Sequence, residues 1–214
     1  QNIKKVYCVS VGTLFGLLIL LGYTTQECIN LILNDLSLDK MVEIKPENIF
    51  RLWDKLGIND GSYLEGVIKN CLQSKGFSPY ITFKELFEET QKELHVGISY
   101  VFKKNFELVN HKTYPDMPVW LALRASTAIP LIFQPLHDTD SNDYLCDGGL
   151  LCNNPIKYAL LDKITENQQQ NQPQVSNMVL PNQFPLHKYK SNIISIDFKV
   201  ILPDYIEKPT LFQY

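Results

Sequence analysis

The sequence predicts an α/β fold in which a mostly apolar sheet is covered by helices on both faces. Three observations support this prediction. Short apolar strands alternate along the chain with segments of helical periodicity. The strands are apolar along most of their length, as is typical of sheets buried on both faces. The chain has 214 residues, 45% of them hydrophobic and 20% charged, which is enough for one sizeable core.

The first element is a strand followed at once by an apolar helix. Residues 6–9 combine β-branched and aromatic side chains and predict a short buried strand, which meets Ser10 in a sharp turn. The helix that follows is expected to end at Gly22. Its apolar run, residues 14–21, is too short to span a bilayer, which needs about 20 residues. We therefore expect this helix to be buried within the protein.

Two further helices are marked by capping boxes, in which a threonine is followed three residues later by a glutamate. Thr24 and Glu27 open a helix that is expected to reach Asn34. Thr82 and Glu85 open another one.

The remaining elements follow from apolar periodicity and from the positions of proline and glycine. We expect helices at residues 46–56, 62–72, 118–125 and 154–161, a loop at 57–61, and strands at 95–102, 106–110, 131–136, 144–146 and 193–198. Residues 167–185 are rich in Gln and Asn and cannot build a core, so they are expected to be a polar insertion or linker. The whole chain, residues 1–214, is predicted to form a single domain.

Charge and cysteine content exclude several classes of protein. The net charge is −3 and the pI is about 5.8, and Lys4-Lys5 and Lys103-Lys104 are isolated pairs, so we expect no nucleic acid as a partner. Five cysteines without a CxxC pair indicate neither a disulfide framework nor a zinc site, and favour a reducing compartment. Cys8, Cys28 and Cys71 lie in apolar surroundings and are expected to be packed thiols.

The first motif with chemical potential is Cys8-Val9-Ser10-Val11-Gly12. A nucleophile elbow places a serine on a strained turn between a strand and a helix, so that its hydroxyl points out of the sheet toward substrate. The helix N-terminus then directs N–H groups at a developing oxyanion. Gly12 is expected to supply the small residue that such a close strand–helix approach needs. The alternative is a serine that only caps the following helix.

The second motif is Asp147-Gly148-Gly149, which follows the predicted strand at 144–146. Two glycines let the backbone turn sharply and let the carboxylate approach another group closely. A partly desolvated carboxylate beside a serine hydroxyl can act as a general base. The alternative is an ordinary Asp-Gly turn.

Taken together, these motifs resemble the patatin-like phospholipase (patatin-like lipid acyl hydrolase) family. The resemblance is carried in order by the elbow with Gly22-Tyr23, by ITFKEL at residues 81–86, by PDMPVWLALRASTAIPLIF at 115–133 and by YLCDGGLLCNNPI at 144–156. It is collinear over about residues 4–161, and the predicted strand at 193–198 is similar to the family's next strand. The third of these stretches is the most specific.

The resemblance implies a hydrolase with a three-layer α/β/α fold. Such an enzyme would cleave fatty-acyl esters of phospholipids, lysophospholipids or neutral lipids. It would use a Ser-Asp dyad and no metal or other cofactor. Ser10 would attack the ester carbonyl, and Asp147 would take its proton. An acyl-enzyme would form and be released by water that Asp147 activates. The backbone N–H of Val11 would be one oxyanion donor. The implied partner is a lipid at a membrane or micelle surface, met by a cytoplasmic or peripheral membrane protein, although no amphipathic basic helix marks a docking face.

The sequence departs from the family pattern in two places. The family's glycine-rich segment, G-G-G-x-[RK]-G, completes the oxyanion hole and precedes the elbow, whereas this chain begins just before the elbow strand. The resemblance therefore implies a fold truncated at its N-terminus. Losing one oxyanion donor costs about 10²–10³ in rate, so an inactive fragment is compatible with this pattern. Cys8 stands where the elbow has its first glycine, and we expect a strained but tolerable elbow.

The sequence also offers alternatives to a Ser-Asp dyad. Ser10, Asp147 and His187 run in the chain order of an α/β-hydrolase triad, but we expect all four histidines (His95, His111, His137 and His187) to be solvated surface residues. Arg124 is expected to make a structural contact in preference to binding phosphate. A lipid-binding or regulatory protein without activity, an acyl transferase and an unrelated α/β domain remain as alternatives.

Overall fold

The computed structural model describes residues 3–37, 52 and 54–171. The chain divides into two compact units, residues 1–161 and 162–214, and the fold described here is that of the first unit. Of the second unit, the structure describes only residues 162–171, which are the end of a helix. The single-domain assignment therefore stays a prediction.

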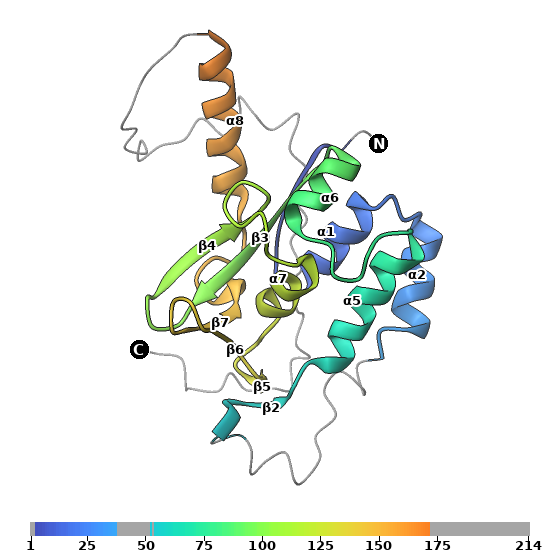
Figure 1. Cartoon of the computed structure of the whole chain (residues 1–214), viewed down its shortest axis with the longest axis vertical. Coiled ribbons are helices and arrows are strands. Elements are labelled where there is room, and N and C mark those ends of the chain that lie inside the picture. The colour runs from blue at the N-terminus through green and yellow to red at the C-terminus, as the bar shows by residue number, and fades with distance from the viewer. Residues whose placement is uncertain (1–2, 38–51, 53, 172–214) are drawn as a thin grey trace, which may run out of the picture. The chain divides into compact units, whose positions relative to one another are not determined.

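Helices and strands alternate along the described chain (Figure 1). In order they are β1 (Lys5–Val9), α1 (Gly12–Leu20), α2 (Thr25–Asn34), β2 (Gly57–Asn59), α5 (Ser62–Ser74), α6 (Phe83–Thr90), β3 (Glu93–Tyr100), β4 (Asn105–Val109), α7 (Val119–Ser126), β5 (Leu131–Phe133), β6 (Leu136–Asp138), β7 (Asp143–Asp147), the 3₁₀-helix η1 (Gly148–Leu150) and α8 (Ile156–Asn171).

The main sheet is mixed and is organised around β3. One edge of β3 pairs along residues 96–100 with β4, which is antiparallel. The other edge pairs with two strands in succession: β1 runs parallel along residues 93–97, and β7 runs antiparallel along residues 98–100. Strand β6 then adds to β7. Because β1 and β7 share one edge of β3 from opposite directions, their C-terminal ends meet near its middle.

Helices cover both faces of this sheet, which confirms the predicted α/β fold class. One face of β3, including Val96 and Ile98, belongs to the main core together with α1, α5, α6 and α7. On the opposite face, the ring of Phe106 in β4 lies 5.2 Å from the ring of Tyr158, near the start of α8. The capping boxes of α2 and α6 form as predicted, with both reciprocal hydrogen bonds present. Helix α1 is largely buried and ends at Leu20, two residues before Gly22, whose φ is 77°.

Three predicted elements were wrong. The expected loop at 57–61 contains β2, which pairs with β5 in a small parallel sheet. The single strand expected at 131–136 is two strands, β5 and β6, which belong to different sheets. The helix expected to end at 161 continues to Asn171, so it includes the first part of the expected polar insertion. In each case a short polar or broken pattern gave no local sign of the distant partner or of helix continuation.

Several predictions lie outside the described residues. These are most of the helix at 46–56, the rest of the polar insertion after residue 171, the strand at 193–198 and His187. Among the described residues, no helix combines the length and apolarity that crossing a membrane requires.

Arg124 makes the structural contact expected of it, through backbone carbonyls. Its side chain is 1% exposed, and Nη2 donates to the carbonyls of Asp60, at 2.8 Å, and Gln134, at 2.9 Å. These residues directly follow β2 and β5, so the guanidinium ties the small sheet to α7. Gly61 makes room for it, since a Cβ at that position would lie 1.9 Å from Arg124 Nε.

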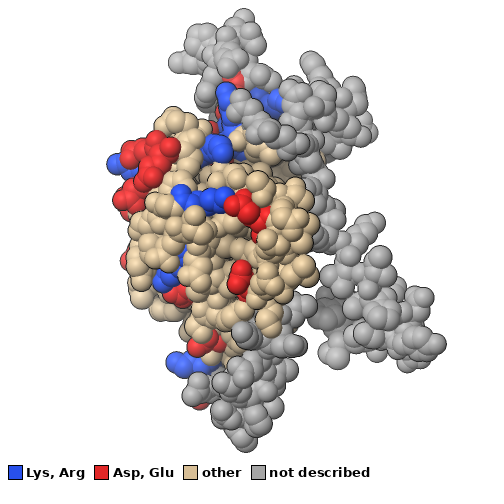
Figure 2. Space-filling view, turned by 90° about the vertical axis from the view of Figure 1, so that its right-hand side faces the viewer, with Lys and Arg blue, Asp and Glu red and all other residues tan. Residues whose placement is uncertain are grey.

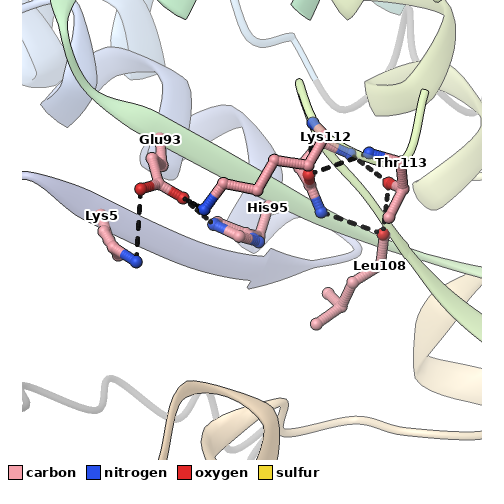
Figure 3. A network of polar contacts seen from close by, with 7 residues as sticks. Lys5, Glu93, His95, Leu108, Lys112 and Thr113 are labelled. Atoms are coloured by element: carbon pink, nitrogen blue, oxygen red, sulfur yellow. Dashed lines mark hydrogen bonds and ion pairs between the residues drawn. The ribbon is translucent and has the colours of Figure 1, made fainter. Parts of the chain in front are cut away.

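A charged network fixes the beginning of β3 (Figure 3). Glu93 lies between Lys5, at 3.3 Å, and Lys112, at 3.1 Å, and it contacts His95 Nε2 at 3.1 Å. The His95 ring also stacks on Tyr7, its register partner in β1. The network therefore joins β1, β3 and the segment after β4 at the sheet end remote from the β1–β7 junction.

Charged side chains are dispersed on the face of the molecule shown in Figure 2, where small groups of Lys and Glu or Asp lie in a largely uncharged surface. The described residues also form ion pairs such as Lys75–Glu27 and Lys69–Glu65. The described residues on this face form no continuous basic stripe of the kind that nucleic-acid binders carry.

Candidate active site

The sheet register brings Ser10 and Asp147 together. Val9 at the end of β1 pairs with Gly97 of β3, and Asp147 at the end of β7 pairs with the next residue, Ile98. Ser10 follows Val9, so the two side chains meet although 137 positions separate them in sequence. Ser10 Oγ donates a 2.5 Å hydrogen bond to Asp147 Oδ2.

The turn at Ser10 has the strained geometry of a nucleophile elbow. Its φ is 55°, in the left-handed region that non-glycine residues rarely adopt. Such a conformation costs about 1–3 kcal/mol and persists only where its surroundings enforce it. Helix α1 begins two residues later, and Thr13 donates to the Ser10 carbonyl through both N–H and Oγ1. These contacts place the serine between a strand and a helix start and leave no support for a simple capping role, because α1 has no side-chain cap.

Ser126 holds the elbow from beneath. Its hydroxyl is fully buried, accepts the Ser10 N–H at 3.0 Å and donates to the Gly97 carbonyl at 2.6 Å. It thereby satisfies two backbone groups at the point where β1 leaves β3. Sequence reasoning missed this residue, because a serine near the end of an amphipathic helix carries no local signal of a role in a turn formed 116 positions away.

Asp147 is held in a buried position by three hydrogen bonds. Its N–H donates to the Ala128 carbonyl at 3.0 Å, and its carboxylate accepts from Ser10 and, through Oδ1, from the Gly149 N–H at 2.7 Å. The side chain is 5% exposed. Burial raises the pKa of this carboxyl above its ordinary value, because it disfavours the charged form more than the hydrogen bonds from Ser10 and Gly149 favour it. A base with a raised pKa accepts a proton from serine more readily.

Cys8 fits into the elbow through a different glycine from the one expected. A Cβ at Gly16 in α1 would lie 2.9 Å from Cys8 Sγ, whereas a Cβ at Gly12 would have no heavy atom within 4 Å. The close strand–helix approach that was expected at Gly12 therefore occurs one helical turn later. The Cys8 thiol is buried, donates to the His95 carbonyl at 3.3 Å and has a pKa raised by burial, so it is a packed thiol as predicted. Cys71 is likewise buried, and Cys28 is half-buried.

The two glycines after Asp147 have separate roles. A Cβ at Gly148 would lie 2.3 Å from the Gly97 carbonyl oxygen, so only glycine fits where η1 crosses β3. Gly149 contributes its N–H to the Asp147 carboxylate. Both roles agree with the predicted close approach of this turn.

The N-terminus of α1 directly follows Ser10. Val11 is the residue before α1, and no group among the described residues accepts a hydrogen bond from its N–H. Free N–H groups and the positive end of the helix dipole favour negative charge at this place. The role of the Val11 N–H as an oxyanion donor stays a prediction.

Comparison with known protein families identifies the family of this chain. The family model described as "Patatin-like phospholipase" matches residues 1–160. The chain belongs to the patatin-like phospholipase family. This membership confirms the resemblance inferred from the motifs, and the matched region includes every residue of the patatin-like site described above.

Several known proteins are similar to this patatin-like chain. A probable lipid hydrolase of Invertebrate iridescent virus 6 is 30% identical over 165 residues, which are 75% of this chain and 54% of the relative. An uncharacterised protein of Acanthamoeba polyphaga mimivirus is 24% identical over 97% of this chain and 68% of its own length. The crystal structure of VipD from Legionella pneumophila is 19% identical, with a TM-score of 0.45, and covers 70% of this chain and 41% of its own. The chain thus spans about half the length of the viral lipid hydrolase.

The described histidines of this patatin-like domain contact residues other than those of the dyad. His137 is exposed and contacts Asn142, as expected for a surface residue. The expectation was wrong for two others. His95 is buried beside Glu93, and His111 is half-buried and stacks on Phe87 at 3.9 Å, which is consistent with a pKa lowered by burial. Aromatic partners in neighbouring elements draw both rings inward.

Replacing Ser126 by alanine is expected to weaken both the fold and the elbow. The Ser10 N–H and the Gly97 carbonyl would lose their partner in a buried place, at a cost of about 1–3 kcal/mol in the free energy of unfolding. Urea unfolding measures this cost. We also expect kcat on a soluble ester to fall about 10-fold with little change in KM, because Ser10 loses its anchored orientation. Thr127→Val is the matched control, since the Thr127 hydroxyl bonds only to carbonyls of its own helix. An unchanged kcat in Ser126→Ala would show that the contact is purely structural.

Proposed function

We propose that this protein hydrolyses fatty-acyl esters of phospholipids, lysophospholipids or related lipids through a Ser10–Asp147 dyad, as a serine carboxylic-ester hydrolase of phospholipase A or lysophospholipase type. One observation carries the proposal: a serine on a strained elbow donates a 2.5 Å hydrogen bond to a buried aspartate whose pKa is raised. Membership of the patatin-like phospholipase family and the likeness to a viral probable lipid hydrolase support the lipid as substrate class.

The geometry suggests how each group acts. Ser10 Oγ attacks the ester carbonyl while its proton passes to Asp147 Oδ2, the atom to which it is already hydrogen-bonded. The oxyanion that forms accepts the Val11 N–H at the start of α1. Asp147 returns the proton to the leaving alcohol, and the acyl group stays on Ser10. Water that donates its proton to Asp147 then attacks the acyl-enzyme, and Asp147 passes this proton to Ser10 Oγ as the fatty acid leaves.

Labelling by a fluorescent alkyl phosphonate tests this proposal directly, because the reagent phosphonylates an activated serine. We expect the full gene product to be labelled and to release fatty acid from lysophosphatidylcholine, and Ser10→Ala to do neither. Ser99→Ala is a suitable control, since the Ser99 hydroxyl is buried on the sheet and bonds the Gly148 carbonyl. Absence of labelling in a folded full gene product would reject the hydrolase and favour a lipid-binding protein. Transfer of the acyl group to an added alcohol in preference to water would instead indicate an acyl transferase.

The pH dependence of kcat/KM is expected to reflect the raised pKa of Asp147. The base must be deprotonated to accept the Ser10 proton, so activity should rise with pH through the pKa of Asp147. Since burial shifts this pKa upward, the acid limb should lie above the range of an ordinary aspartate. Initial rates on a soluble ester between about pH 3 and 8 measure the inflection. An inflection at or below the ordinary aspartate value would contradict the assignment of Asp147 as the base.

A further inference from the structure

Five exposed aliphatic side chains lie in chain segments next to the dyad. The residues Val11, Ile129, Leu131, Leu150 and Leu151 are between 42% and 63% exposed. We call these five residues the aliphatic rim. They come from three separate segments of the chain, so no single amphipathic helix or strand produces the pattern.

Each segment of the rim is attached to the dyad. Val11 directly follows Ser10. Ile129 directly follows Ala128, whose carbonyl accepts the Asp147 N–H. Leu150 and Leu151 close the η1 turn whose Gly149 N–H binds the Asp147 carboxylate. The rim therefore lies where these three segments converge on the Ser10–Asp147 hydrogen bond.

Leu131 adds a sign of backbone strain. Its φ is 69°, in the left-handed region that leucine rarely adopts, and its side chain is the most exposed of the rim. Strained backbone of this kind concentrates at functional sites, because the surrounding structure must enforce it.

The rim segments are also free of exposed charge. Residues 11–22, 125–137 and 148–156 contain no Asp, Glu, Lys or Arg, in a chain that is 20% charged. An exposed aliphatic cluster of this kind marks an interaction site. A water-soluble ester would gain little from it, whereas a lipid aggregate offers an apolar layer into which such side chains transfer favourably.

We propose that the aliphatic rim docks the protein on the surface of a lipid bilayer or micelle, with insertion of apolar side chains and not charge attraction as the driving interaction. This inference rests on the proposed function, which it deepens by naming the residues that meet the lipid surface. Docking through the rim brings the ester bond of a lipid to Ser10 without the lipid having to leave its aggregate. Binding should consequently occur on zwitterionic vesicles and change little with salt, since no rim residue is charged.

Vesicle flotation of the full gene product carrying Ser10→Ala tests this inference, because the inactive protein cannot alter the vesicles. We expect it to bind phosphatidylcholine vesicles, and we expect its affinity for them to be similar at about 50 mM and about 500 mM salt. The double variant Leu131→Asn and Leu150→Asn should bind about 10- to 100-fold more weakly, from the lost transfer of two half-exposed leucines. Asparagine tolerates positive φ, so the backbone at 131 is preserved.

Leu33→Asn is the matched control. Leu33 is an exposed leucine of α2, which Figure 1 shows on the side of the unit away from β7 and η1. We expect it to leave vesicle binding unchanged. A second measurement places a fluorescent reporter in the rim. Brominated phosphatidylcholine should quench the added fluorescence of Leu131→Trp. It should not quench the added fluorescence of Leu33→Trp.

The outcomes separate the two proposals. Equal vesicle binding by the rim double variant and its parent, with no quenching at position 131, would overturn the docking inference even if the protein hydrolyses lipids. Rim-dependent binding by a protein that is never labelled at Ser10 would support docking and reject the hydrolase. A rim-dependent dimer in the absence of lipid, without vesicle binding, would also overturn the inference, in favour of a second copy of this chain as the occupant.

Discussion

Asp147→Asn is expected to reduce lipid hydrolysis by about 10⁴-fold, as loss of a group that acts with the nucleophile does in other serine hydrolases. Asparagine has nearly the same shape and keeps an oxygen for the Gly149 N–H. It cannot accept the Ser10 proton, so phosphonate labelling and fatty-acid release should both fall while the site keeps its geometry. Retention of more than about a tenth of the activity would show that another group is the base.

The same substitution is expected to stabilise the fold. The pKa of Asp147 is raised in the folded state, so folding favours the protonated form, and the stability associated with this group is lost as pH rises through that pKa. At neutral pH the buried carboxylate therefore destabilises the protein, and a neutral amide removes that penalty. Thermal unfolding at pH 7 should show a Tm at or above that of the parent, and the difference should disappear in acid.

Asp143 at the other end of β7 provides the matched control. Burial raises its pKa, but hydrogen bonds from the Phe102, Lys103 and Tyr144 N–H groups together outweigh burial and bring the pKa below the ordinary value. Its charge stabilises the fold above its unfolded pKa, and this contribution is lost as pH falls. Asp143→Asn should lower the Tm at pH 7. Equal Tm changes for the two variants would contradict the assigned difference in environment.

Gly148→Ala is expected to disrupt the site by steric conflict alone. The added Cβ would lie 2.3 Å from the Gly97 carbonyl oxygen and 2.7 Å from its carbon, and backbone atoms cannot rotate away as a side chain can. We expect a loss of about 3 kcal/mol in the free energy of unfolding and loss of labelling at Ser10, because β7 must move relative to β3. Urea unfolding and phosphonate labelling measure the two effects.

Gly12→Ala is the informative partner of that variant, because Gly12 belongs to the other motif. A Cβ at Gly12 meets no heavy atom within 4 Å, so the fold should lose little stability. Comparable destabilisation by both substitutions would show that packing around the elbow differs from the structure described here.

The sequence was sufficient for the elements whose signals are local. A strand, a serine turn and an apolar helix were predicted from adjacent residues, and the capping boxes of α2 and α6 from a three-residue spacing. The two strands of the β3–β4 hairpin were also predicted, from the periodicity of residues 95–102 and 106–110. Short-range hydrogen bonds and side-chain periodicity determine these features, so their pattern can be recognised in the sequence.

Strand pairing was harder to predict, because the partner strand is distant in the sequence. Strands β2 and β5 are three residues each and meet across more than 70 positions, and a three-residue pattern cannot identify a partner. His95 and His111 were expected at the surface because the aromatic rings that stack on them belong to other elements. The polar run after residue 161 begins within a helix, since α8 continues through Gln-rich sequence that composition alone assigns to a linker.

For the candidate site, the sequence alone determined that Ser10 lies on a strand-to-helix turn, that Asp147 lies on a glycine turn, and that both belong to a patatin-like pattern. Only the tertiary structure decided that the two side chains meet, that Ser126 anchors the elbow, and that Gly16 and Gly148, but not Gly12, are required by close packing. The reason is physical: a motif specifies local backbone shape, whereas contacts across 116 or 137 positions depend on how β1 and β7 share one edge of β3.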